Sequence, residues 1–117
     1  MKREVIWIWA AEMDDQEVFV LLDAQSPGAG IRMVELTDQL LALLQDFPCN
    51  APVWRPPLRR VVLRKTPYAL YYVVEPNRLV ITGMQDVRRN PDRLRRDLLR
   101  HLPKWMKGGA SPFTNRP

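Results

Sequence analysis

Arginine and lysine side chains dominate the residues that could do chemistry in this sequence. Five cations in and after a predicted basic strand are candidates for binding phosphate or a charged target: Arg60, Arg64, Lys65, Arg88 and Arg89. Arginine suits this task because its planar guanidinium can donate to two oxygen atoms at once. Three further arginines on a predicted helix could contact a target or an acidic protein partner: Arg93, Arg96 and Arg100. These residues predict a surface that binds anions.

Proton-transfer groups are scarcer than the cations. Cleaving RNA through its own 2′-hydroxyl requires a base, cations for the phosphorane charge and an acid for the leaving oxygen. The single histidine, His101, is expected near the end of a helix, and Asp86 is expected to be held ionised by the arginines that follow it. Tyr68, Tyr71 and Tyr72 are expected to pack in a strand. The catalytic residues therefore remain unassigned, and whether the chain is an enzyme stays open.

Several other kinds of site lack support in the sequence. There is no Gly-rich phosphate loop, no nucleophile elbow and no metal-ligand cluster, so we expect neither a metal nor another cofactor. The single cysteine, Cys49, cannot form a disulfide within the chain, which favours a reducing cytoplasm. No run of about 18 apolar residues could form a transmembrane helix. We therefore expect a cytoplasmic protein without a membrane partner.

Charge is distributed very unevenly along the chain. Residues 1–50 contain three Lys or Arg and nine Asp or Glu, whereas residues 51–117 contain fifteen and four. A positive field from the second half would attract phosphate backbones or an acidic protein segment. The alternative is a charged surface that serves solubility alone.

The elements that must position these residues begin with one strand and two helices. With 117 residues, 46% of them hydrophobic, the chain is long enough for one domain with its own core. We expect a strand over residues 4–9, a helix over 10–25, and a second helix over 31–47. The first helix carries apolar and acidic residues at helical spacing: Met13, Glu17, Val20, Leu21 and Ala24. The second carries Met33, Leu36, Leu40, Leu44 and Phe47 on one side, beside Val34 and Leu41. A proline- and glycine-containing break at 26–30 separates the helices, and a proline-rich loop over 48–57 follows them.

The second half predicts three strands and a final helix. Strands are expected over 58–65, 68–75 and 79–85, joined by turns at Thr66-Pro67 and Pro76-Asn77. Asn90-Pro91 should cap a helix with an apolar stripe of Leu94, Leu98 and Leu102, closed by Pro103. The predicted fold is α+β, in the order β-α-α-β-β-β-α, with an antiparallel meander packed against a helical hairpin. We expect a domain over 1–103, a flexible tail over 104–117, and an open sheet face that bears Arg60 and Arg64.

The basic strand, the proline turn and the aromatic strand over residues 59–74 resemble the strand pair of the RelE/ParE superfamily of toxins. The segment Arg88-Arg89-Asn90-Pro91, which follows the next strand, completes the resemblance. The resemblance is specific over residues 58–91 and looser over 4–47, and the tail after Leu102 is unmatched. Many ParE-type relatives carry a histidine three residues before the arginine that corresponds to Arg89, whereas this chain has Asp86 there.

The resemblance implies the toxin of a type II toxin-antitoxin system, of the kind that serves plasmid stabilisation. Its partner would be a cognate antitoxin, whose partly disordered segment folds on the toxin. ParE-like members block DNA gyrase, whereas RelE-like members cleave mRNA in the ribosome. Because the proton-transfer set is incomplete, we expect a ParE-like toxin that inhibits growth. The alternatives are a RelE-like endoribonuclease and, third, a non-toxic module that binds nucleic acid or protein; the oligomeric state stays open.

Overall fold

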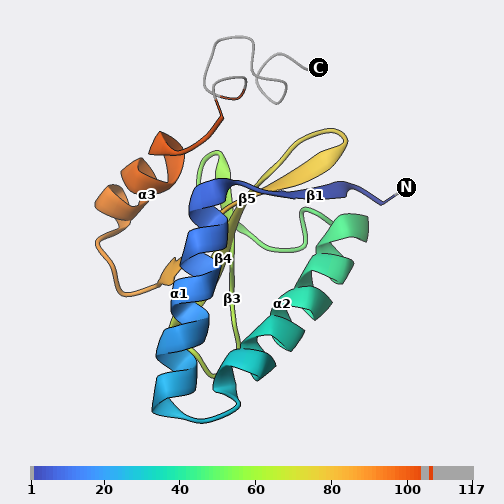
Figure 1. The fold of residues 1–117 in the computed structure, drawn as a ribbon. Coiled ribbons are helices and arrows are strands. Elements are labelled where there is room, and N and C mark those ends of the chain that lie inside the picture. Colours follow the sequence, from blue (N-terminus) through green and yellow to red (C-terminus); the bar gives the residue numbers. More distant parts are fainter. Residues whose placement is uncertain (1, 104–105, 107–117) are drawn as a thin grey trace.

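The computed structural model describes residues 2–103 and 106, which form three helices and five strands (Figure 1). Their order along the chain is β1 (Glu4–Trp7), α1 (Trp9–Gln25), α2 (Ala29–Asp46), β2 (Val53–Arg55), β3 (Leu58–Val62), β4 (Tyr68–Val74), β5 (Arg78–Asp86) and α3 (Pro91–Arg100). The predicted α+β class and element order are confirmed, with β2 as an addition. The expected flexible tail, 104–117, lies outside the described residues apart from Met106, which is buried.

The strands form one sheet in the order β1-β5-β4-β3-β2. The meander of β3, β4 and β5 is antiparallel, as predicted, and β1 adds to β5 in parallel. The short strand β2 pairs with the beginning of β3 inside the segment that was predicted to be a loop. Only Val53, Trp54 and Arg55 form it, and prolines flank these three residues on both sides. A strand this short carries no alternation that the sequence could reveal.

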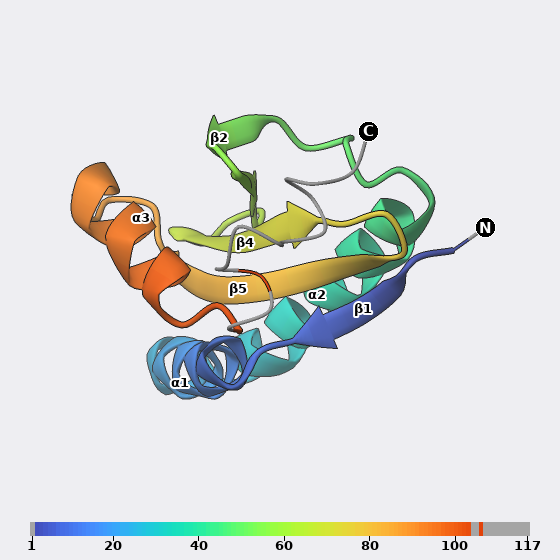
Figure 2. The ribbon, with the colours of Figure 1, turned by 90° about the horizontal axis from the view of Figure 1, so that it is seen from above.

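The two long helices form a hairpin on one side of the sheet, while β2 lies toward the other side (Figure 2). Ala11, Val18 and Leu22 are the buried residues of α1. The stripe predicted for α1 was therefore wrong, since Met13 and Val20 are exposed. Glu17, Leu21 and Ala24 are exposed as well. The reason is that α1 has apolar residues on two faces, so that helical spacing alone does not indicate which face packs against the sheet.

Helix α2 begins at Ala29, two residues earlier than predicted, and Gly30 lies inside it. A Cβ atom at Gly30 would come within 2.9 Å of the Phe19 ring, so the missing side chain allows α1 and α2 to approach closely. Gly28 makes the turn between the helices with a φ of 89°. Met33, Leu41 and Leu44 are buried as expected, whereas Val34 and Phe47 are exposed.

Helix α3 packs on β5 through the apolar side chains that the sequence predicted. Leu94 and Leu98 are buried, and the Asn90 side chain accepts hydrogen bonds from the backbone N–H groups of Asp92 and Arg93. A Cβ atom at Gly83 of β5 would lie only 2.5 Å from Leu98, so this glycine makes room for the helix. The helix ends at Arg100 rather than at Pro103, although Leu102 is buried as expected.

Candidate target-binding surface

Tyr71, in the middle of β4, lies close to Arg60, one of the cations predicted to bind a target. Its ring is buried and meets the ring of Trp54 edge-on, with the centroids 5.0 Å apart. The Arg60 guanidinium lies 5.5 Å from the centre of the Trp54 ring. The Tyr71 hydroxyl is buried without a well-aligned hydrogen-bond partner. Burial raises the pKa of Tyr71, and the nearby Arg60 opposes this rise only in part. Tyr71 therefore stays protonated near neutral pH.

Arg89, in the connection between β5 and α3, links the sheet to the helix. Its guanidinium donates to Gln85 Oε1 at 2.9 Å and to Asp97 Oδ2 at 2.6 Å. The hydrogen bond from Arg89 lowers the pKa of Asp97, to which Arg100 also lies close at 3.5 Å. The charges of Arg89 and Arg60 both act on Tyr71. Arg89 therefore links β5 to α3 through its contacts with Gln85 and Asp97.

The predicted ion pair of Asp86 is confirmed. The Arg88 guanidinium donates to Asp86 Oδ2 at 2.6 Å, and the Arg88 backbone N–H donates to Oδ1 at 2.8 Å. These hydrogen bonds lower the pKa of Asp86 to about 2. A carboxylate with so low a pKa is a weak base, and it holds no proton to donate near neutral pH.

Two arginines of this region, Arg55 of β2 and Arg95 of α3, were not among the site residues that the sequence predicted. Arg55 forms an ion pair with Asp92 of α3 at 3.6 Å and lies 5.9 Å from the centre of the Trp54 ring. Arg95 of α3 donates to the Pro56 carbonyl oxygen at 2.8 Å. The sequence signal was an aromatic residue beside a cation, Trp54-Arg55, but prolines on both sides indicated a loop.

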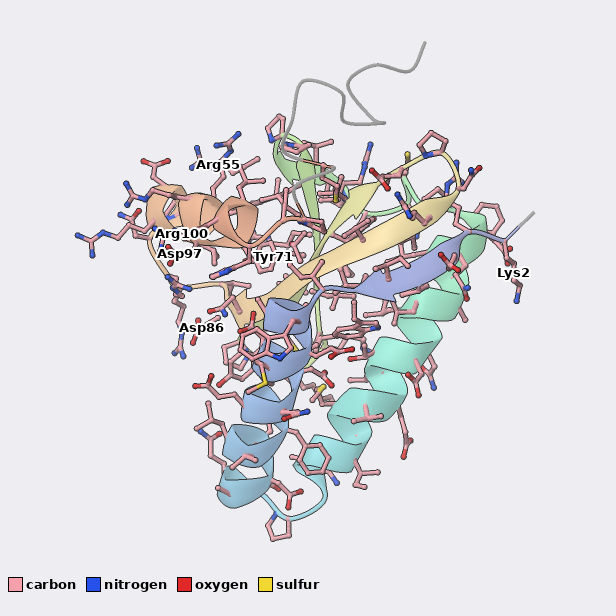
Figure 3. All side chains as sticks on the ribbon, turned by 45° about the horizontal axis from the view of Figure 1, so that its top comes forward. Lys2, Arg55, Tyr71, Asp86, Asp97 and Arg100 are labelled. Carbon is pink, nitrogen blue, oxygen red and sulfur yellow. The ribbon has the colours of Figure 1, made fainter. Side chains whose placement is uncertain are left out.

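We define the basic surface as eight arginines with the three aspartates among them. The surface lies at the end of the molecule that carries α3, where Figure 3 shows Asp86, Asp97 and Arg100, while Lys2 lies at the opposite end. Its members are Arg55, Arg60, Arg88, Arg89, Arg93, Arg95, Arg96 and Arg100, with Asp86, Asp92 and Asp97. The structure thus brings together six of the eight residues that the sequence predicted for binding a target or an antitoxin.

The other two predicted residues, Arg64 and Lys65, lie elsewhere. They belong to the turn between β3 and β4, where they line a cleft with Arg32 and Leu36 of α2. The five cations predicted to bind phosphate therefore do not form one site. The division arises because β3 ends at Val62, so that Arg64 no longer follows the alternation of the strand.

His101 lies where the sequence placed it, at the C-terminal end of α3. It lines a polar cavity of about 280 Å³ together with Asp14, Arg89 and Asp97. Asp14 accepts a hydrogen bond from the Met84 N–H at 3.1 Å, where β5 extends beyond its pairing with β1. Burial raises the pKa of Asp14. No side-chain hydrogen bond joins His101 to another described residue, and the described residues contain no cluster that could hold a metal ion.

Comparison with known proteins identifies a solved structure with a similar fold. No protein-family model and no curated protein matches the chain. A solved structure titled "Chromosomal ParDE TA system from P. aeruginosa" is similar, with a TM-score of 0.61 and 17% identity. The match covers 74% of this chain and 97% of that chain. The fold is ParE-like. The predicted fold class is thereby confirmed.

A ParE-like fold that carries this basic surface can bind an anionic partner. The arginines can donate many hydrogen bonds to phosphate or carboxylate oxygens. Among the titratable residues beside them, Tyr71 is buried and protonated, and Asp86 and Asp97 are ionised. No helix in the described part of the chain is long and apolar enough to cross a membrane.

Proposed function

We propose that this chain is the toxin of a type II toxin-antitoxin system and that it inhibits growth by blocking a DNA-handling enzyme, with DNA gyrase the expected target. The observation that carries the proposal is a ParE-like fold with a surface of eight arginines, beside which Asp86 is ionised in an ion pair and Tyr71 is buried and protonated. The similarity of fold supports the role of a toxin, and the basic surface supports binding of a target rather than cleavage of RNA.

The side chains at the basic surface argue against RNA cleavage. A general base must accept a proton near neutral pH, and a general acid must hold one. Asp86 is ionised and bound to Arg88, and Tyr71 keeps its proton in a buried position. His101 lines a cavity with Asp14, Arg89 and Asp97, and its side chain forms no hydrogen bond with another described residue. Stabilisation of a bound, charged partner needs none of these proton transfers.

The proposed partner in the cell is a cognate antitoxin. The exposed arginines of α3, Arg93, Arg96 and Arg100, follow one another at helical spacing and face solvent. Cations arranged in this way attract the carboxylates of an acidic segment as readily as they attract DNA phosphates. An antitoxin that covers this stripe would block access to the target.

Controlled expression in a bacterium, combined with assays on the purified protein, tests the proposal. The variant R93Q/R96Q removes two exposed cations without touching the ion pairs of Arg88 and Arg89, which also hold the connection to α3 in place. The matched control K2Q/R32Q removes two exposed cations outside the basic surface. We expect the wild type and the control to cause filamentation and to inhibit supercoiling by gyrase. R93Q/R96Q should inhibit about tenfold less, because each charge-assisted hydrogen bond lost weakens binding.

Three outcomes would contradict the proposal or a part of it. Rapid loss of translation with cut messages would identify a ribosome-dependent endoribonuclease. Absence of any growth defect would favour a module that binds nucleic acid or protein without toxicity. Equal inhibition by R93Q/R96Q and the wild type would show that Arg93 and Arg96 of α3 do not contribute to target binding.

A further inference from the structure

A second group of cations meets at a cleft on the hairpin side of the molecule. Arg32 of α2 and the neighbours Arg64 and Lys65 of the β3–β4 turn line two cavities, of about 250 and 320 Å³, which also share Leu36. We call these adjoining cavities the hairpin cleft. All three cations are exposed.

The charges of the hairpin cleft are not balanced by the residues that line it. Glu35 is the one carboxylate among the lining residues, and none of the three cations forms an ion pair with another described residue. Arg32 is the single Lys or Arg of α1 and α2, which together carry eight Asp or Glu. Three cations that converge without partners repel one another, so an anion bound between them would be stabilised.

The floor of the hairpin cleft is apolar. Leu22 of α1 and Met33 of α2 are buried beneath it, and Leu36 is half-buried at its side. A ligand with carboxylates for the cationic rim and an apolar side chain for the floor would satisfy both parts. A cavity of this size has room for a side chain, and methionine adapts readily to different apolar shapes.

Nucleic acid fits the hairpin cleft less well than peptide does. None of the described residues that line the cleft is aromatic, so a base would find no ring on which to stack. A long phosphate backbone would also run across the acidic hairpin, which repels it. A peptide segment can place its carboxylates at the rim only and keep apolar or neutral residues elsewhere.

We propose that the hairpin cleft binds an acidic peptide segment that inserts an apolar side chain between α2 and the β3–β4 turn. That an antitoxin supplies this segment rests on the proposed function, whereas the binding of an acidic peptide to the cleft does not. The cleft thus assigns Arg64 and Lys65 to a protein partner rather than to phosphate.

Fluorescence anisotropy with a short, labelled peptide of glutamate and leucine residues tests this inference on the full chain. The variants R32Q and R64Q each remove one exposed cation of the cleft, and K2Q removes one exposed cation outside both the cleft and the basic surface. We expect R32Q or R64Q to weaken binding about threefold, the double variant R32Q/R64Q to weaken it about tenfold, and K2Q to leave it nearly unchanged, since only the cleft variants remove partners of the bound carboxylates. The variant L36Q, at the apolar side of the cleft, should also weaken binding.

Changes in the peptide keep the test independent of the folding of the variants. Replacing its glutamates with glutamine, or its leucines with serine, should each abolish measurable binding to the wild-type protein. Equal losses in R64Q and K2Q would overturn the inference, because they would indicate attraction to net charge alone. Stronger competition by single-stranded DNA or RNA than by unlabelled peptide would overturn it too. None of these readouts depends on growth inhibition, so failure here leaves the proposed function to its own test.

Discussion

Replacing Gly83 with alanine would show how tightly α3 is held against the sheet. A Cβ atom at this position would lie 2.5 Å from Leu98 Cδ2 and 2.8 Å from Asp14 Oδ2. Carbon atoms in contact are normally 3.5–4.0 Å apart, so Leu98 or the whole helix would have to move by roughly 1 Å. The backbone of Gly83 does not have a positive φ, so the alanine meets only this steric obstacle.

Two opposing effects set the size of the change in the free energy of unfolding. Alanine in a strand is favoured over glycine by about 0.5–1 kcal/mol, because glycine loses more conformational freedom on folding. Overpacking a close-packed site costs about 1–3 kcal/mol. Leu98 is only 4% exposed, so it cannot swing aside without losing buried apolar contacts. The steric cost should exceed the conformational gain, so the free energy of unfolding of G83A should be lower than that of the wild type by about 1–2 kcal/mol.

A double-mutant cycle with L98A, measured by urea denaturation and circular dichroism, isolates the contact. L98A alone should cost about 2–5 kcal/mol, because it leaves a cavity beneath α3. In the L98A background the Cδ2 atom is gone, so G83A should cost at least about 1 kcal/mol less than in the wild type. Additive effects, or a G83A protein as stable as the wild type, would refute the close packing of α3 on Gly83.

Three further predictions concern buried polar groups and the cap of α3. The two tyrosines should respond oppositely in denaturation experiments: Y71F should be as stable as the wild type or up to about 1 kcal/mol more stable, because the Tyr71 hydroxyl lacks a well-aligned hydrogen-bond partner. Y72F should be less stable by about 1 kcal/mol, because it loses the hydrogen bond to the Pro48 carbonyl oxygen at 2.8 Å; equal effects would contradict this assignment. Burial raises the pKa of Asp14 above 3.8, so the folded chain binds the Asp14 proton more tightly than the unfolded chain does. The protonated carboxyl therefore contributes stability at low pH, and this contribution is lost as the pH rises from about 4 through the raised pKa. D14N does not titrate, and its stability relative to the wild type should therefore increase between pH 4 and pH 7; a constant difference in urea midpoints would show that the pKa is not raised. N90A should lower the free energy of unfolding by about 1 kcal/mol, since it removes the acceptor for two N–H groups of α3, and an unchanged melting temperature would exclude the cap.

Local signals in the sequence were sufficient for β4, β5 and α3. Asn90-Pro91 combines a side-chain acceptor with a fixed φ, and both act within one turn of the helix they begin. The turns after β3 and β4 separate strands whose pairing needs no distant partner. Element type and order could therefore be predicted there without knowledge of the tertiary structure.

The face that α1 buries and the grouping of the cations depend on tertiary packing. Trp9 and Val20 are as apolar as Val18 and Leu22, and only the position of the sheet decides which pair is covered. Likewise, Arg60 and Arg64 have the spacing of one strand face, but the strand ends between them and the chain turns toward α2. Trp54 contacts Tyr71, which is distant in sequence, and no local pattern predicts that contact.

The uneven distribution of charge makes the folded chain an electric dipole. The hairpin carries most of the carboxylates on one side of the sheet, whereas the arginines gather at β2, the end of β5 and α3. In the field of a polyanion, such a molecule experiences a torque before any atoms touch, and it arrives with α3 foremost. Salt shortens the range of this effect to about 8 Å at physiological ionic strength. The association rate with an anionic target should therefore fall steeply with added salt, while the dissociation rate changes little.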